Sequence, residues 1–233
     1  MTHEAEQRSA FIRAAVSMAI VTVSILWFAG TARAQRPGPP GAAFTEGRAP
    51  ASIDAVVIHP IVAVAFTCSE HAFHEADPII LGDATGADCT VVEYDTQPAG
   101  RRPPRHYEND GSRNEDWFGW GETLLAPFDG VIEEIHTNPV TNTPGTPGKG
   151  PASFIVFLRA DGTRVVYGHI RNARVTEGDT VAAGQPVADV GNNGFGYMPH
   201  THVGAWRDGE PLQVRFDLVA MGALRRAAVR SER

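Results

Sequence analysis

The sequence has few cysteines, no excess of positive charge, and no lysine between positions 160 and 233. Its 233 residues carry a formal net charge of −7. Proteins that bind nucleic acid electrostatically present a basic surface, so this charge balance excludes nucleic acid as an expected partner. We find no long internal repeat. The composition, 42% hydrophobic and 20% charged, is that of a globular protein with one core.

The first residues are typical of an export signal. Arginines precede the apolar run "AAVSMAIVTVSILWFAG", and Ala32 and Ala34 form a small-x-small cleavage site. We therefore expect a signal peptide over residues 1–34 and an exported chain, either periplasmic or secreted. The alternative is an uncleaved membrane anchor, because about 17 apolar residues is the lower limit for a spanning helix.

The two cysteines, Cys68 and Cys89, are expected to pair. An exported chain favours a disulfide over free thiols. The bridge would close a loop of about 20 residues, which contributes roughly 3 kcal/mol through the entropy of the unfolded chain. The alternative is two buried thiols.

Short segments rich in Val and Ile dominate the chain from Gly121 onward, each bounded by Gly, Asp or Asn. This pattern predicts a mainly β fold, an antiparallel β-sandwich or distorted barrel of short strands. Residues 137–152 are rich in Pro and Gly and are expected to form a long surface loop, of the kind that often lines binding sites. The segment "DLVAMGALRRAAVRSER" predicts a short C-terminal helix with a basic tail.

Several histidines have a spacing that suits a metal site. His200 and His202 are two apart, so on a strand they share one face, about 7 Å apart at their Cα atoms. His106 stands four residues before Asp110, from where both can reach one ion. Two imidazoles and a carboxylate form a known type of catalytic zinc site with a position left for water. Spacing alone leaves open whether His200, His202 or both bind the metal.

Another group of histidines lies in "SEHAFHEADPIILGDATGAD". His71 and His74 stand there among acidic residues. Their spacing matches no recognised ligand pattern, so we expect a solvated loop.

The order of motifs resembles the lysostaphin-type zinc metallopeptidases, which cut peptide bonds in bacterial cell-wall peptidoglycan. That family has His-x-x-x-Asp, a Gly-x-x-x-x-Ala-x-x-Asp-Gly segment, Tyr-x-His, a Val-x-x-Gly-Asp-x-Val-x-x-Gly-Gln turn pair, Gly-Asn-x-Gly and Pro-His-x-His. The corresponding stretches here are "HYEND", "GETLLAPFDGVI", "YGHI", "VTEGDTVAAGQPVADV", "GNNG" and "PHTH". The resemblance covers residues 106–206.

The resemblance implies a role for each matching residue. His106, Asp110 and His202 would be ligands of Zn²⁺. His200 and His169 would be catalytic, taking a proton from the attacking water and stabilising the oxyanion. The resemblance thus implies a zinc metalloendopeptidase that acts on peptidoglycan peptides.

This sequence departs from the family pattern at two places. Asp110 lies further ahead of Gly121 than is common, with "GSRNED" resembling an insertion. Asp116 stands nearer the usual place, but Ser112 rather than histidine precedes it by four residues, so His106 and Asp110 are retained. Gly204 replaces an acidic residue often found after His-x-His.

Two other function classes share features with this sequence. Some members of the same fold lack ligands and act as non-catalytic activators or scaffolds of cell-wall hydrolases, and this remains the alternative function. A lipoyl or biotinyl carrier, suggested by "VTEGDTVAAGQPVADVG", needs a lysine at a hairpin tip and is excluded by the absence of lysine after position 160.

The expected organisation has five parts. They are a signal peptide (1–34), a flexible linker (35–55), a β-rich N-terminal extension carrying Cys68 and Cys89 (56–100), a peptidase domain (101–220) and a basic tail (221–233). The expected partner is a peptidoglycan peptide, with membrane contact only if the signal segment stays uncleaved. The sequence does not define the oligomeric state.

Overall fold

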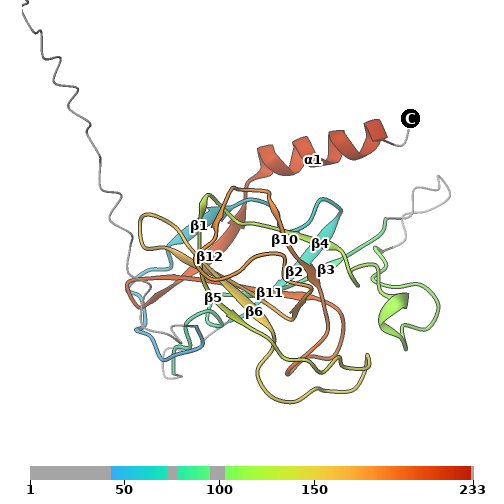
Figure 1. Cartoon of the computed structure of the whole chain (residues 1–233), viewed down its shortest axis with the longest axis horizontal. Helices are drawn as coiled ribbons and strands as arrows, with labels where there is room; N and C mark the ends of the chain where they lie inside the picture. Colours follow the sequence, from blue (N-terminus) through green and yellow to red (C-terminus); the bar gives the residue numbers. More distant parts are fainter. Residues whose placement is uncertain (1–42, 73–77, 95–102, 232–233) are drawn as a thin grey trace, which may run out of the picture. The chain divides into compact units, whose positions relative to one another are not determined.

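The computed structural model describes residues 43–72, 78–94 and 103–231 (Figure 1). All of them belong to the unit Pro37–Arg233. The expected signal peptide, most of the first half of the linker and His74 lie outside these residues. Within the described part of the chain, no helix has the length and apolarity needed to cross a membrane.

Two β-sheets build the fold, and Figure 1 labels strands of both. The large sheet has the order β1 (Ala55–Ile58), β12 (Glu210–Phe216), β11 (Thr201–Arg207), β7 (Arg164–Gly168), β6 (Phe154–Leu158), β5 (Gly130–His136) and β9 (Thr180–Val181), with β3 (Ala87–Val91) also paired to β11 and β2 (Phe66–Glu70) paired to β3. The small sheet is β4 (Thr123–Leu125), β10 (Pro186–Val190) and β8 (Ile170–Arg171). The predicted mainly β fold is confirmed.

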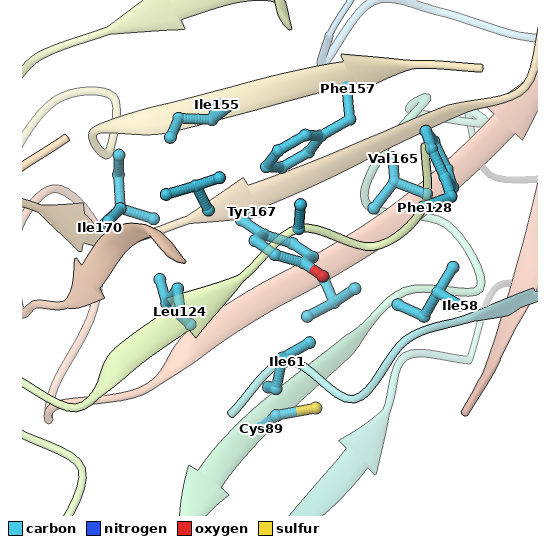
Figure 2. Packing of buried hydrophobic residues seen from close by; sticks show 14 of the residues in the cluster. Ile58, Ile61, Cys89, Leu124, Phe128, Ile155, Phe157, Val165, Tyr167 and Ile170 are labelled. Carbon is cyan, nitrogen blue, oxygen red and sulfur yellow. The ribbon is translucent and has the colours of Figure 1, made fainter. Parts of the chain in front are cut away.

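The main hydrophobic cluster lies between the two sheets (Figure 2). All five side chains of strand β6 are buried, so both faces of the sheet are covered at this strand. A continuous apolar run of this kind is typical of a strand buried on both faces. Ile155 and Phe157 point into the main cluster, where the Phe157 ring packs edge-on against Tyr167 at 5.0 Å between centroids. Phe154 and Val156 belong to a second, smaller cluster on the opposite face.

Strands from the predicted N-terminal extension are integrated into the large sheet. β1 pairs in parallel with β12, and β3 pairs antiparallel with β11. In β3 the buried residues alternate with half-buried Asp88 and Thr90, which is the pattern of a strand with one face toward a core. The segment 56–100 therefore shares one sheet with the segment 101–220.

The predicted pairing of Cys68 with Cys89 is confirmed by a disulfide. The two cysteines stand directly opposite each other on β2 and β3. Cys89 is buried in the main cluster, where its sulfur is visible in Figure 2. The bridge thus fastens β2 to the strand that carries Asp88.

Replacing both cysteines by alanine is expected to lower the free energy of unfolding by about 3 kcal/mol, because the unfolded chain regains the entropy of an open loop. Urea denaturation of the double variant and the oxidised wild type measures this difference. Wild type reduced with dithiothreitol should show a similar loss. Equal midpoints for the oxidised and reduced protein would contradict the expectation.

Helix α1 (Leu218–Ser231) follows β12 directly, in agreement with the predicted C-terminal helix. The carboxylate of Asp217 accepts hydrogen bonds from the backbone N–H groups of Val219 and Ala220, at 2.8 and 3.0 Å. An acidic N-cap of this kind satisfies N–H groups that have no partner within the helix. The helix begins, as a result, at the end of the sheet.

Candidate metal centre

Strand β11 brings its two histidines to one end of the large sheet. His202 lies opposite Asp88 on β3 and opposite Gly168 on β7. Because Gly168 has no side chain, the His202 ring has room beside β7: a Cβ at position 168 would stand 3.2 Å from His202 Cβ. The pairing of β3 with β11 therefore places a carboxylate next to an imidazole across 114 residues of sequence.

Three side chains form a group that can hold a metal ion: His71, Asp88 and His202. One ligand atom from each lies within 4.8 Å of the others. Among the residues that the structure describes, no other group of three His, Cys, Asp or Glu side chains meets this criterion.

The two imidazoles of this group are each oriented by a second partner. His71 donates a hydrogen bond from Nδ1 to Asp83 Oδ1 at 3.0 Å, and its Nε2 lies 3.3 Å from Asp88 Oδ2. His202 donates from Nε2 to the carbonyl oxygen of Gly82 at 2.6 Å, which leaves Nδ1 facing Asp88 Oδ1 at 3.0 Å. The nitrogens that face the Asp88 carboxylate are therefore Nε2 of His71 and Nδ1 of His202.

The electrostatics of the group favour positive charge between these atoms. Burial raises the pKa of Asp88, but the hydrogen bond from His202 and the nearby imidazoles outweigh it and hold the pKa well below its usual range. Burial lowers the pKa of His202, whereas its hydrogen bonds to Asp88 and Gly82 raise it, and the net shift is upward. A cation can supply this charge while both rings stay neutral, and two imidazole nitrogens with one carboxylate oxygen suit Zn²⁺.

Two further histidines stand beside this group. His200 Nε2 lies 3.6 Å from Asp88 Oδ1, and the rings of His200 and His169 have centroids 4.3 Å apart. His200 donates from Nδ1 to the carbonyl oxygen of Met198 at 2.8 Å, and His169 does the same to Asn193 at 2.7 Å. Both rings are therefore held with Nε2 as the nitrogen left for chemistry.

Burial keeps these two histidines uncharged. Burial and the neighbouring His200 lower the pKa of His169 to about 3. The pKa of His200 is also lowered, mainly by burial and in spite of the favourable charge of Asp88. Neutral imidazoles can accept a proton, which is the property a general base requires.

All five of these histidine and aspartate side chains line one cavity of about 710 Å³. Gly150, Pro151 and Ala152 form part of its wall, so the predicted loop at 137–152 does border a binding cavity. The aromatic rings of Phe195 and Tyr197 line it as well and are 71% and 51% exposed.

The structure does not bring His106 and Asp110 together with His202. His106 Nδ1 is 3.0 Å from Thr90 Oγ1, and His106 is not among the residues that line the cavity. Asp110 lies in an exposed turn between two residues with positive φ, and its carboxylate accepts a hydrogen bond from the backbone N–H of Ser112. In the described structure, the group that could hold a metal ion therefore consists of His71, Asp88 and His202, and His106 and Asp110 are not part of it.

His71, which was expected to lie in a solvated loop, is thus part of the candidate site. The family's His-x-x-x-Asp spacing would require histidine at position 84, four residues before Asp88, but alanine stands there. His71 comes from further upstream and reaches the same carboxylate. Sequence spacing could not identify His71 as a site residue. Its partner Asp88 is recognised as the relevant acid only from the pairing of β3 with β11.

An asparagine network near the cavity was also not anticipated. Asn193 accepts from the N–H of Ser153 at 2.6 Å and donates to the carbonyl of Ile170 at 2.8 Å, while its own carbonyl holds His169. Asn142 donates to the carbonyls of Gly194 and Gly196. The "GNNG" motif therefore links the 137–152 loop to the histidine that it positions.

Asp116 and Asn114 shape the loop in which they lie. Asp116 accepts hydrogen bonds from Asn109 and Arg113, at 3.0 to 3.3 Å. Asn114 accepts a bond from Asn192 and donates one to the carbonyl of Asn142.

Residues 117–214 match the model of peptidase family M23. This part of the chain is an M23 peptidase domain. The resemblance to the lysostaphin-type peptidases is thereby confirmed at the level of the family. His200, His202 and His169 lie inside the matched residues of the M23 domain, whereas His71 and Asp88 precede them. No curated protein sequence matches the chain significantly.

Several solved structures are similar to the chain. A mutant catalytic domain of the prophage-encoded M23 protein EnpA from Enterococcus faecalis is 20% identical, over 67% of this chain and 88% of that one, with a TM-score of 0.39. A zinc-containing peptidase from Vibrio cholerae is 15% identical, over 76% of this chain and 40% of that one, with a TM-score of 0.38. The complex of SpoIIIAH and SpoIIQ gives 16% identity, 66% and 95% coverage and a TM-score of 0.41.

Proposed function

We propose that the chain is an exported zinc-dependent endopeptidase that hydrolyses peptide bonds in bacterial cell-wall peptidoglycan. The observation that carries the proposal is the convergence of His71, Asp88 and His202 within 4.8 Å in the same cavity as two neutral histidines. The match of residues 117–214 to the M23 family model supports peptidase activity. The two imidazole nitrogens and one carboxylate oxygen support Zn²⁺ as the metal.

Three residues would hold the ion through defined atoms. His71 would bind through Nε2, His202 through Nδ1 and Asp88 through its carboxylate, because the other ring nitrogens are engaged by Asp83 and Gly82. Zn²⁺ in such a site lowers the pKa of water and polarises a carbonyl group. With three protein ligands, one coordination position remains open.

The two remaining histidines would carry the proton transfers. His200 stands next to Asp88 and accepts the proton of the attacking water at Nε2. Once it carries that proton, His200 would pass it from Nε2 to the leaving amine, while the Nε2 lone pair of His169, whose ring contacts that of His200, would accept a hydrogen bond from the attacking water. Both rings are oriented by backbone carbonyls, so neither has to reorganise during the reaction.

The cavity is suited to an extended peptide. It is large enough for several peptide units, and the Phe195 and Tyr197 rings at its rim offer apolar surface to the substrate backbone. The leader sequence with its small-x-small site and the bridged cysteines support export, where peptidoglycan is accessible.

The proposal is tested with the full chain exported by a bacterial host and purified without chelators. Metal analysis should give about one zinc per chain. Incubation with purified peptidoglycan sacculi should release new amino groups, as expected for peptide-bond hydrolysis. Removal of zinc with 1,10-phenanthroline should stop the release, and added Zn²⁺ should restore it.

The same experiment distinguishes the proposed peptidase from the alternative, non-catalytic function. Bound zinc without any release of amino groups from sacculi or soluble stem peptides would support a non-catalytic activator or scaffold. Absence of both zinc and hydrolysis would contradict the proposal.

A further inference from the structure

A covering layer of two backbone segments lies next to the candidate metal centre. We call residues 43–48 the strap and residues 79–83 the crossing segment. Backbone hydrogen bonds of 2.7 to 2.8 Å join them, from Phe44 to Leu81, from Leu81 to Thr45 and from Gly47 to Ile79. A fourth bond, from Arg48 N–H to the carbonyl of Gly209, ties the strap to the turn between β11 and β12.

The covering layer is packed onto the sheet as a small core of its own. Its apolar side chains Ala43 and Leu81 are buried together with residues of β6, β7 and β11, namely Phe154, Val156, Val166 and Trp206. This face is opposite the main cluster and is the same face that carries His202. The layer therefore buries apolar surface that the large sheet would otherwise expose to water.

Glycines allow the two segments to approach the sheet closely. A Cβ at position 204 on β11 would lie 1.8 Å from the carbonyl oxygen of Gly82. A Cβ at position 47 would lie 2.4 Å from Leu81 Cδ2 and 2.9 Å from the carbonyl oxygen of Gly209. The stack of strap, crossing segment and β11 thus depends on glycine in two of its layers, and it accounts for glycine at the position where the resemblance leads one to expect an acid.

The crossing segment also provides the partners that orient both candidate histidine ligands. Gly82 accepts the hydrogen bond from His202 Nε2, and Asp83 accepts the one from His71 Nδ1. On the strap, the Phe44 ring faces the His202 ring, with centroids 6.1 Å apart, and lines the same cavity. The strap is hydrogen-bonded to the crossing segment as far as Leu81. The two residues that follow Leu81 in that segment hold the two imidazoles.

We propose that the strap and crossing segment position the metal ligands, with Asp83 and Gly82 as positioning residues and the strap as their support. The inference rests on the proposed function, because it concerns the ion that His71, Asp88 and His202 would bind. Groups that orient metal-ligating histidines commonly contribute about 10–100-fold to metal affinity. Displacing the crossing segment should therefore weaken zinc binding without touching a ligand.

The test compares zinc dissociation constants measured by competition with a chromophoric chelator. Asp83→Ala removes the acceptor of His71 and should weaken binding by about 10–100-fold. Asp83→Asn keeps a carbonyl acceptor and should recover most of that loss. Gly47→Ala acts at the strap alone and should weaken binding by about 10-fold, because its Cβ must displace Leu81 or the Gly209 carbonyl.

The matched control is Gly119→Ala, where a new Cβ meets only ordinary contacts of 3.6 Å or more with Val91. It should bind zinc as wild type does. If Gly47→Ala does not fold, Leu81→Ala tests the same contact by removing the side chain against which the strap packs. Absorption spectra of the Co²⁺-substituted variants report whether the ligand geometry has changed, which a merely structural role would leave untouched.

The results separate failure of the inference from failure of the proposed function. Folded Asp83→Ala and strap variants that bind zinc as tightly as wild type would overturn the inference while the metal site stands. A wild-type chain that binds no zinc would overturn the proposed function first.

Discussion

Replacing His71 or Asp88 by alanine is expected to weaken zinc binding by about 10²–10³-fold, whereas replacing His106 or Asp110 should leave it intact. Structural zinc sites bind with an apparent free energy of about 10–16 kcal/mol, which is roughly 2.5–4 kcal/mol for each of four ligands. That corresponds to an affinity loss of about 10²–10³-fold. Isothermal titration with zinc, or competition with a chelator, measures the difference.

The comparison decides between two ligand sets. His106 and Asp110 have the spacing of the family motif, but their side chains contact Thr90 and the backbone of Ser112. His71 and Asp88 do not have the spacing of the family motif, but their ligand atoms lie within 4.8 Å of each other and of His202. Loss of zinc in His106→Ala together with its retention in His71→Ala would show that the active arrangement differs from the one described.

The His200→Ala variant is expected to keep its zinc and lose activity, by about 10²–10⁴-fold in kcat. The reason is that His200 is not part of the group that could hold the metal ion, and that its Nε2, which lies 3.6 Å from Asp88, is the nitrogen left for proton transfer. His202→Ala, two residues along the same strand, should lose both zinc and activity. Release of amino groups from peptidoglycan, paired with metal analysis of each variant, separates the two effects.

A suitable control is His136→Ala. That ring stacks on Phe154 at 5.4 Å and is not among the residues lining the cavity, so activity and zinc content should stay near those of wild type. If His200→Ala released the metal as readily as His202→Ala, the assignment of His200 to catalysis would be wrong.

Local features of the fold were predictable because they depend on short stretches of sequence. The strand segments around Ile155, Val166 and Val187 combine β-branched or aromatic residues with Gly and Asp turns, and they form β6, β7 and β10. The pairing of Cys68 with Cys89 followed from having two cysteines in a chain expected to be exported. The shared face of His200 and His202 followed from the strand period alone.

The ligand set was not predictable because it depends on contacts distant in sequence. Asp88 becomes a site residue only when β3 pairs with β11, and nothing within the segment around Asp88 signals that pairing. His71 reaches the site from outside the motif spacing. By contrast, His106 and Asp110 satisfy a local pattern, and Asp110 falls in an exposed turn because Asn109 and Gly111 beside it both take positive φ.

Gly204, two residues after His202, is a feature that can be searched for in related sequences. Since any side chain there would collide with the backbone at Gly82, a chain bearing a larger residue cannot carry the same crossing. A His-x-His-x-Gly string in a related sequence therefore indicates room for a second backbone segment across this strand, beside the last histidine.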